Sequence, residues 1–256
     1  MKLRTIVYKS GSYNSSSMDP LISIAITVAL SLILSLTAWK VGMLTADGAV
    51  AAAIVLLAIG IMGGLDWLLM LVIFAIIGFA VTKVAFGKKK EKGVQEGKSG
   101  ERGWKNIAGV ALAPAIVSAI NFAIPGYHDL LAVAYLSTIA VAASDTVASE
   151  IGVRDPKAWL ITTFKRVTAG TNGGISVTGS LISFAASVAV SVIGWAILFR
   201  DLSWLFLIPA VAGMLGNLLD SLFGATIEDR YISKYTNNFM TGLFGGLIAA
   251  IMYLQF

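Results

Sequence analysis

Eight long apolar segments restrict most strongly what this chain can fold into. A helix needs roughly 20 apolar residues to cross the hydrocarbon core of a bilayer. The segments cover residues 20–39, 46–63, 65–86, 106–123, 128–148, 175–199, 203–224 and 238–255. Because their apolar residues are continuous rather than alternating, a transmembrane β-barrel is disfavoured. The sequence predicts an all-α, polytopic transmembrane helical bundle of about eight spans.

Composition agrees with a membrane protein and excludes several kinds of site. Only 13% of the residues are charged and 57% are hydrophobic, whereas soluble domains have about 25% charged residues. The chain has no cysteine and a single histidine, His128. Disulfides, thiolate nucleophiles, cysteine metal sites and histidine clusters are therefore excluded.

The first 17 residues differ from the rest in composition. They read MKLRTIVYKSGSYNSSS, are polar and rich in serine, and are followed by a second methionine, Met18. We expect residues 1–17 to be a leader added to the natural chain or a disordered N-terminus. We expect residues 18–256 to form a single transmembrane catalytic domain.

The distribution of Lys and Arg predicts the orientation in the membrane. After Met18 the chain has sixteen of them, and fifteen follow the first, third, fifth and seventh segments, with Lys83 counted at the end of the third. Arg200 alone lies on the other side. By the positive-inside rule, the basic side is cytoplasmic and both ends of the mature chain lie outside. The polar motifs cluster on this cytoplasmic face, which favours an enzyme site over a pore at the midplane.

The motif SDTVASEIG (144–152) places two carboxylates at the end of an apolar segment. On a helix, Asp145 and Ser149 share one face, while Thr146 and Glu150 share a neighbouring face. Acids near the membrane interior are costly and commonly functional. The alternative is that both acids only cap and solvate the helix end.

A second motif, GNLLDSLFGA (216–225), forms a polar stripe on an apolar helix. Asn217, Asp220, Ser221 and Gly224 follow one another at helical spacing. Lipid cannot satisfy these polar groups, so they must face protein or water. The alternative role is adhesion between helices through the amide and hydroxyl groups.

Two further segments carry cations. KRVTAGTNGGISVTG (165–179) joins Lys165 and Arg166 to a glycine-rich run, whose N–H groups can bind phosphate oxygens ahead of a helix N-terminus. GERGWKN (100–106) places Arg102 and Lys105 beside the next apolar segment. Their alternative role is to fix the topology.

The motifs together suit phosphoryl or nucleotidyl transfer at a membrane surface. They supply acids on two helices, hydroxyls, amides, a glycine loop and cations. Mg²⁺ binds oxygen ligands, often one or two carboxylates together with substrate phosphates. We expect Asp145 and Asp220 to be the catalytic metal ligands, with Glu150 as a third candidate.

The motifs GERGWKN, ASDTVASEIG, GTNGGISVTG, GNLLDSLFGA and TNN, in this order, resemble the integral membrane family that contains plant phytyl-phosphate kinase. The resemblance covers essentially the whole chain from Met18. It implies transfer of a phosphate from a nucleoside triphosphate, CTP being the expected donor, to an isoprenoid monophosphate such as phytyl or geranylgeranyl phosphate. The chain also resembles, more distantly, polyprenol kinases and CTP-dependent phosphatidate cytidylyltransferases.

The leading hypothesis is a Mg²⁺-dependent prenyl-phosphate kinase in the bilayer. A transporter or flippase of a phosphorylated lipid and a lipid cytidylyltransferase are the alternatives. No nucleic-acid partner is expected, and a homo-oligomer is compatible with the sequence. The candidate substrate- and nucleotide-binding residues are Arg102, Lys105, Ser144, Thr146, Ser149, Lys165, Arg166, Gly170, Thr171, Asn172, Gly173, Gly174, Asn217, Ser221, Asn237 and Asn238.

Overall fold

The fold is an all-α bundle with a small sheet at one end. The computed structural model describes residues 18–91, 97, 100–155 and 157–256, so residues 1–17 and part of the predicted basic loop lie outside the described residues. The helices of the described part are α1 (Pro20–Lys40), α2 (Ala46–Met62), α3 (Leu65–Glu91), α4 (Trp104–Ala123), α5 (His128–Ile151), α6 (Val177–Phe199), α7 (Leu207–Thr226) and α8 (Lys234–Tyr253).

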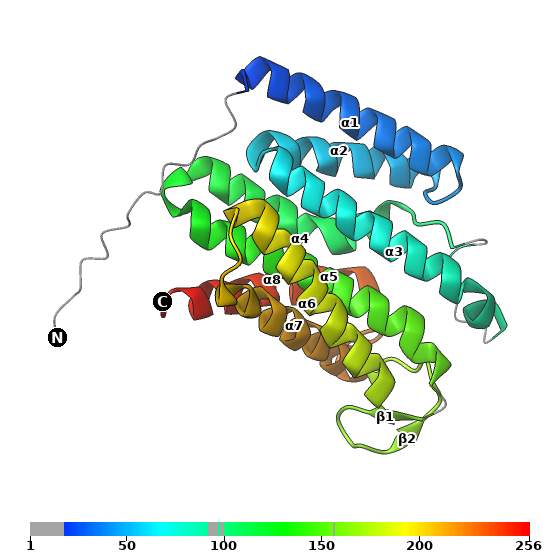
Figure 1. Ribbon diagram of the computed structural model, residues 1–256. Helices are drawn as coiled ribbons and strands as arrows, with labels where there is room; N and C mark the ends of the chain where they lie inside the picture. The colour runs from blue at the N-terminus through cyan, green and yellow to red at the C-terminus, as the bar shows by residue number, and fades with distance from the viewer. Residues whose placement is uncertain (1–17, 92–96, 98–99, 156) are drawn as a thin grey trace, which may run out of the picture.

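Helix α5 is the centre of the bundle. It packs against α3, α4, α6, α7 and α8, while α1 and α2 lie together at one side (Figure 1). In its most apolar 18-residue window 78% of the residues are buried, compared with 17–39% in the other long apolar helices. Ser144, Thr146 and Glu150 near the end of α5 are therefore surrounded by protein, so this helix can support a site.

Six helices in the described part of the chain are long and apolar enough to cross a membrane, namely α1, α3, α4, α5, α6 and α7. Helix α2 is apolar but has 17 residues. Helix α8 has 20 residues and does not meet the same hydropathy requirement. The fold class is confirmed, while the count of eight spans and the cytoplasmic orientation stay predictions.

Side chains just before the helices accept hydrogen bonds from the first turn and so determine where helices begin. The Thr45 hydroxyl accepts from the N–H of Gly48 at 3.3 Å. The Ser176 hydroxyl accepts from the N–H of Gly179 at 3.0 Å. The caps of α2 and α6 thus follow directly from the local sequence.

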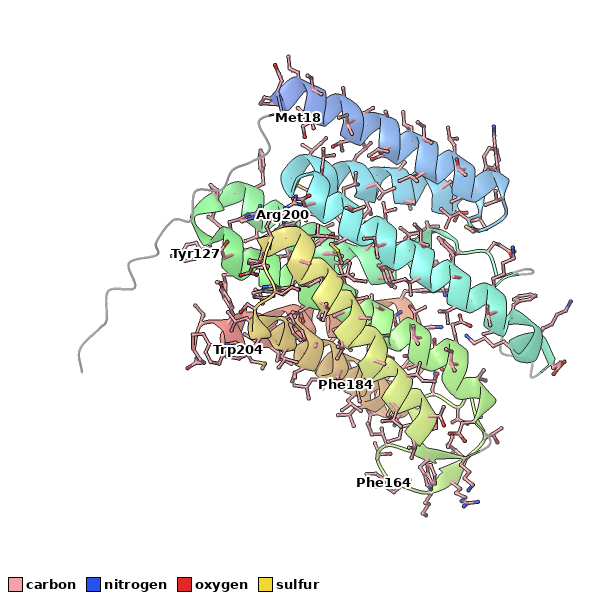
Figure 2. All side chains as sticks on the ribbon, viewed as in Figure 1. Met18, Tyr127, Phe164, Phe184, Arg200 and Trp204 are labelled. Carbon is pink, nitrogen blue, oxygen red and sulfur yellow. The ribbon has the colours of Figure 1, made fainter. Side chains whose placement is uncertain are left out.

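A three-stranded antiparallel sheet follows α5 and was not predicted. Strands β1 (Ala158–Leu160), β2 (Arg166–Val167) and β3 (Gly174–Ile175) pair in the order β2-β1-β3. The sheet and its hairpin project from the end of the bundle where Phe164 lies, whereas Arg200 and Trp204 lie at the other end (Figure 2). The strand pairing returns the glycine-rich segment to the end of α5.

Candidate functional site

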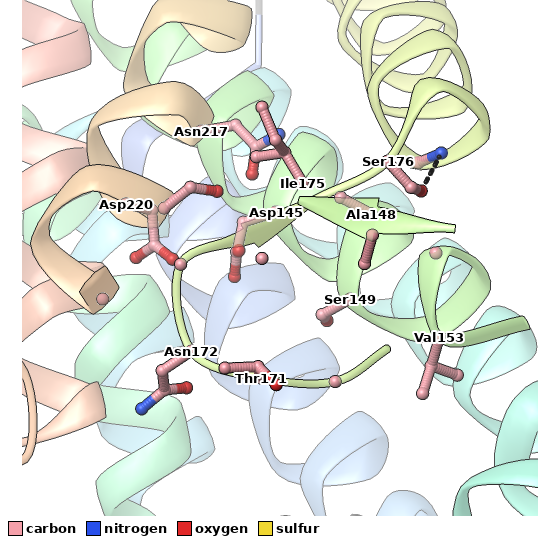
Figure 3. Close-up of a pocket in the computed structure, with 18 of the residues that line it drawn as sticks. Asp145, Ala148, Ser149, Val153, Thr171, Asn172, Ile175, Ser176, Asn217 and Asp220 are labelled. Atoms are coloured by element: carbon pink, nitrogen blue, oxygen red, sulfur yellow. Dashed lines mark hydrogen bonds between the residues drawn. The ribbon is translucent and has the colours of Figure 1, made fainter. Parts of the chain in front are cut away.

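A polar cavity of about 320 Å³ lies where α5, α7 and the glycine-rich segment meet. Its walls carry carboxylates, hydroxyls and amides, contributed by segments far apart in the sequence (Figure 3). The predicted site residues that line it are Asp145, Ser149, Gly170, Thr171, Asn172, Gly173, Gly174, Asn217, Asp220 and Ser221. The tertiary fold thus brings the three central motifs of the sequence to one cavity.

Asp145 and Asp220 line this cavity next to each other (Figure 3). They lie on α5 and α7, and their carboxyl groups are close enough to interact directly. Two adjacent carboxylates repel each other unless a cation or a shared proton lies between them. The pair is therefore suited to hold a cation.

The two aspartates offer carboxylate oxygens toward the cavity. Oδ1 of Asp220 is buried and has no hydrogen-bond partner. Among the described residues, no three His, Cys, Asp or Glu side chains converge on one point in the way a protein-only metal site requires. Two carboxylates with open positions fit Mg²⁺, which commonly keeps waters and substrate phosphates as its other ligands.

The glycine-rich segment packs against α7 so closely that a side chain would not fit. Gly173 has φ +72°, and a Cβ there would overlap with Ala225. A Cβ on Gly224 would lie 3.0 Å from the Gly173 nitrogen. Glycine is needed at residue 173 because it permits the left-handed conformation and the close approach together.

The side chain of Glu228 holds the glycine-rich segment and α8 together. Asn172 Nδ2 donates to Glu228 Oε1 at 3.1 Å and to Asp229 Oδ2 at 2.6 Å. Asn237 Nδ2 donates to Glu228 Oε2 at 2.7 Å and to the carbonyl oxygen of Asp220 at 3.1 Å. Burial raises the pKa of Glu228, and the hydrogen bond from Asn237 acts in the opposite direction.

Glu150 does not join the two aspartates. Its carboxylate pairs with Lys89 at 3.0 Å and with Arg102 at 3.4 Å, and Thr82 donates to it at 3.0 Å. Glu150, the third candidate ligand, thus lies on the neighbouring face of α5, where two cations and a hydroxyl contact its oxygens, and its role in metal binding stays a prediction. Arg102, predicted to reach the phosphates, is part of the same group.

Several other predicted residues lie away from the cavity lining. Lys165 and Arg166 are exposed on the β1–β2 hairpin. Lys105 lies over the ring of Trp104, 5.9 Å from its centroid. Ser144 is fully buried and shares a hydrogen bond of 2.6 Å with Ser183.

The last three predicted residues, Asn237, Asn238 and Thr146, do not line the polar cavity. Asn237 is fully buried behind Asp220. Asn238 and Asp145 line a small separate cavity between α4, α5 and α8. Thr146 lines a different, apolar cavity.

Sequence reasoning missed five polar or charged residues that line the polar cavity: Lys89, Ser176, Ser180, Glu228 and Lys234. Each stands within or beside a segment that had been singled out. The 3.6-residue helical period could not find them, because Ser176 and Glu228 lie in connections, and Ser180 and the two lysines lie near helix ends. Lys234 supplies a cation at the cavity lining, whereas Lys165 and Arg166 do not line the cavity.

The arrangement has the parts needed to bind a polyphosphate. Two carboxylates can hold a divalent cation, and the lysines together with the N–H groups of the glycine-rich segment can bind anionic oxygens. Since α5 and α7 pack closely against each other, they hold the carboxylates in place before a ligand binds.

Comparison with known proteins places the chain among membrane proteins. It is 32% identical to the uncharacterized membrane protein MJ0933 of Methanocaldococcus jannaschii, over 93% of this chain and 97% of that protein. It is 34% identical to the uncharacterized membrane protein sll0875 of Synechocystis sp., over 76% of each chain. It is 30% identical to Protein VTE6, chloroplastic, of Arabidopsis thaliana, over 77% of this chain and 63% of that protein.

No solved structure matches the chain. The family described as Integral membrane protein DUF92 matches residues 29–251, which is most of the described bundle. These matches confirm the family resemblance that the five motifs indicate. The chain therefore belongs to the integral membrane family DUF92.

Proposed function

We propose that this protein is a membrane-embedded prenyl-phosphate kinase. It transfers the γ-phosphate of CTP, or of another nucleoside triphosphate, to an isoprenoid monophosphate such as phytyl or geranylgeranyl phosphate. The observation that carries the proposal is the adjacent pair Asp145 and Asp220, which shares a polar cavity with a glycine-rich segment. Membership of a family that includes VTE6 supports a prenyl-phosphate kinase-like enzyme.

Asp145 and Asp220 hold Mg²⁺ in this proposal. The unpartnered oxygen of Asp220 and the direct interaction between the two carboxyl groups support it. When bound, Mg²⁺ supplies positive charge that orients the donor phosphates and offsets their repulsion of the incoming nucleophile. Glu150 is not included in the proposed metal site.

The glycine-rich segment binds the triphosphate through its backbone. Thr171, Asn172 and Gly173 line the same cavity as the aspartates, and Glu228 keeps Asn172 in place. Lys234 and Lys89 line the same cavity and offset phosphate charge. Since the following helix begins at Val177, its N-terminus adds a favourable partial charge.

The proposed reaction needs no general base in the protein. An oxygen of the acceptor phosphate forms the new bond to the γ-phosphorus, and the bond from that phosphorus to the β,γ-bridging oxygen breaks. The products are a prenyl diphosphate and the nucleoside diphosphate. A phosphate monoester already carries anionic oxygens at neutral pH, so the nucleophile does not have to lose a proton. The single histidine lies at the start of α5, in another part of the bundle, and the reaction does not need it.

Product analysis tests the function directly. Purified protein in detergent receives Mg²⁺, CTP and a panel of prenyl monophosphates, and the products are identified by mass. A prenyl diphosphate together with CDP supports the proposal. A CDP-lipid with pyrophosphate indicates a cytidylyltransferase, and lack of turnover with every nucleotide, combined with lipid movement across vesicles, indicates a transporter or flippase.

A further inference from the structure

A second cavity, of about 420 Å³, lies between α1, α2, α3 and α4. Its walls are aliphatic and aromatic, with residues such as Leu34, Val55, Phe74 and Val110. The volume falls in the range of roughly 300–1,000 Å³ that is typical of small-molecule sites. Val41 and Ile76 line it and are more than half exposed, so the cavity reaches the surface of the bundle.

The apolar cavity lies at the same end of the bundle as the polar one. It is lined by the end of α1, the first half and middle of α3, the start of α4 and Thr146 in the last turns of α5. Thr146 follows Asp145, which lines the polar cavity. Adjacent residues of α5 therefore face the two cavities.

A buried group of charges separates the two cavities. Arg102 lines the apolar cavity and Lys89 lines the polar cavity, while Glu150 pairs with both. Arg102 is the one charged side chain among the described residues that line the apolar cavity. A ligand that fills this cavity and carries an anionic head group would meet cations at the boundary with the polar site.

We propose that the apolar cavity binds the hydrocarbon chain of the acceptor, a prenyl monophosphate, with its phosphate on the Arg102 side and directed toward Asp145 and Asp220. The assignment rests on the proposed function, because that function requires a lipid acceptor. Three observations select this ligand class: an apolar interior, one cation at one end, and a boundary shared with the polyphosphate cavity. Access from the surface at Val41 and Ile76 suits a ligand that arrives from the bilayer.

The test fills the cavity without touching the polar site. Ala75 lines the apolar cavity from α3, and A75W fills space that the chain of the ligand would occupy. Ala80 lies on the same helix, is exposed and does not line the cavity, so A80W is the matched control. A52F narrows the cavity from α2 and serves if A75W fails to fold.

Binding is measured without nucleotide, on purified protein in detergent, for geranylgeranyl monophosphate and for geranyl monophosphate, which has half the chain length. We expect A75W or A52F to weaken binding of the longer ligand by about tenfold or more and binding of the shorter ligand much less. The loss of affinity should grow with the length of hydrocarbon chain that no longer fits in the cavity. A80W should bind both ligands like the wild type. The apparent KM for CTP should stay unchanged in any variant that retains turnover.

Two results would overturn the assignment. One is equal affinity of wild type, A75W and A52F for geranylgeranyl monophosphate. The other is a bilayer phospholipid that native mass spectrometry detects in the wild type but not in A75W, and that geranylgeranyl monophosphate does not displace. If the longer ligand binds as expected and no nucleotide converts it to a diphosphate, the kinase proposal fails while the lipid-phosphate site stands.

Discussion

The ammonium group of Lys89 lies 3.0 Å from Oε2 of Glu150, and both side chains are almost completely buried. Lys89 comes from the end of α3 and lines the polar cavity, whereas Glu150 lies behind it near the end of α5. Arg102 approaches the other carboxylate oxygen. This pairing gives Glu150 a role in positioning cations, although its motif in the sequence suggests a metal ligand.

Removing Glu150 should therefore cost stability rather than metal binding. In Glu150→Ala, Lys89 and Arg102 lose a buried counter-charge, which typically costs about 3–5 kcal/mol. Thermal unfolding in detergent measures the loss. Glu150→Gln should unfold at a lower temperature than the wild type and keep the wild-type Mg²⁺ dependence of activity. A normal unfolding temperature with altered Mg²⁺ dependence would return Glu150 to the metal site.

Replacing either aspartate by asparagine should remove activity and leave the fold intact. Asp145→Asn and Asp220→Asn keep the size of the side chain but lose the charge that binds the cation. Since a metal contributes several kcal/mol to the stabilisation of transition-state charge, we expect activity to fall at least about a hundredfold. Activity is measured against Mg²⁺ concentration, beside thermal unfolding. Wild-type activity in either variant removes that residue from the site.

A methyl group at residue 173 should displace the glycine-rich segment. Gly173→Ala introduces a Cβ where Ala225 lies, in a backbone conformation that costs a residue with a Cβ about 1–2 kcal/mol. The apparent KM for the nucleotide should rise while the helical content of the bundle, followed by circular dichroism, stays unchanged. Gly87→Ala is the control, because no atom lies within 4 Å of its added Cβ. Equal KM values for the two variants would contradict the role of the segment.

Lys234 at the polar cavity should contribute more to nucleotide binding than Lys165 on the hairpin. Lys234 lines the polar cavity, whereas Lys165 is exposed outside it. We expect Lys234→Met to raise the apparent nucleotide KM several-fold more than Lys165→Met, since only Lys234 is near the proposed phosphate position. Initial rates at varied CTP give both values. A larger effect at Lys165 would indicate that the hairpin folds over the bound nucleotide.

Topology is tested by labelling from one side of the membrane. Cysteine introduced at Lys165 should react from the cytoplasm, and cysteine introduced at Arg200 from the opposite side; the natural chain has no cysteine that would interfere. Both residues are exposed. Arg200 pairs with Asp66 at 2.8 Å on the surface, so its replacement should cost at most about 1 kcal/mol. The reverse labelling would refute the predicted orientation.

The sequence by itself determined the helices and their motifs. Apolar segments of membrane-spanning length predict α1 to α8 within a few residues at most ends, because backbone groups in lipid must be satisfied within each helix. Helical spacing correctly placed Asn217, Asp220 and Ser221 on one face, which lines the polar cavity. It also assigned Asp145 and Glu150 to different faces of α5, which is how they lie.

Tertiary structure alone decided which charges meet. Periodicity describes one helix and carries no distance between helices, so it could not show that Lys89 and Arg102 would take Glu150, or that Glu228 would hold Asn172. Helical periodicity also could not predict the short strands. Their paired residues are separated by turns and do not follow a helical repeat. The apolar cavity likewise has no pattern in the sequence, because its volume depends on how four helices pack around small side chains.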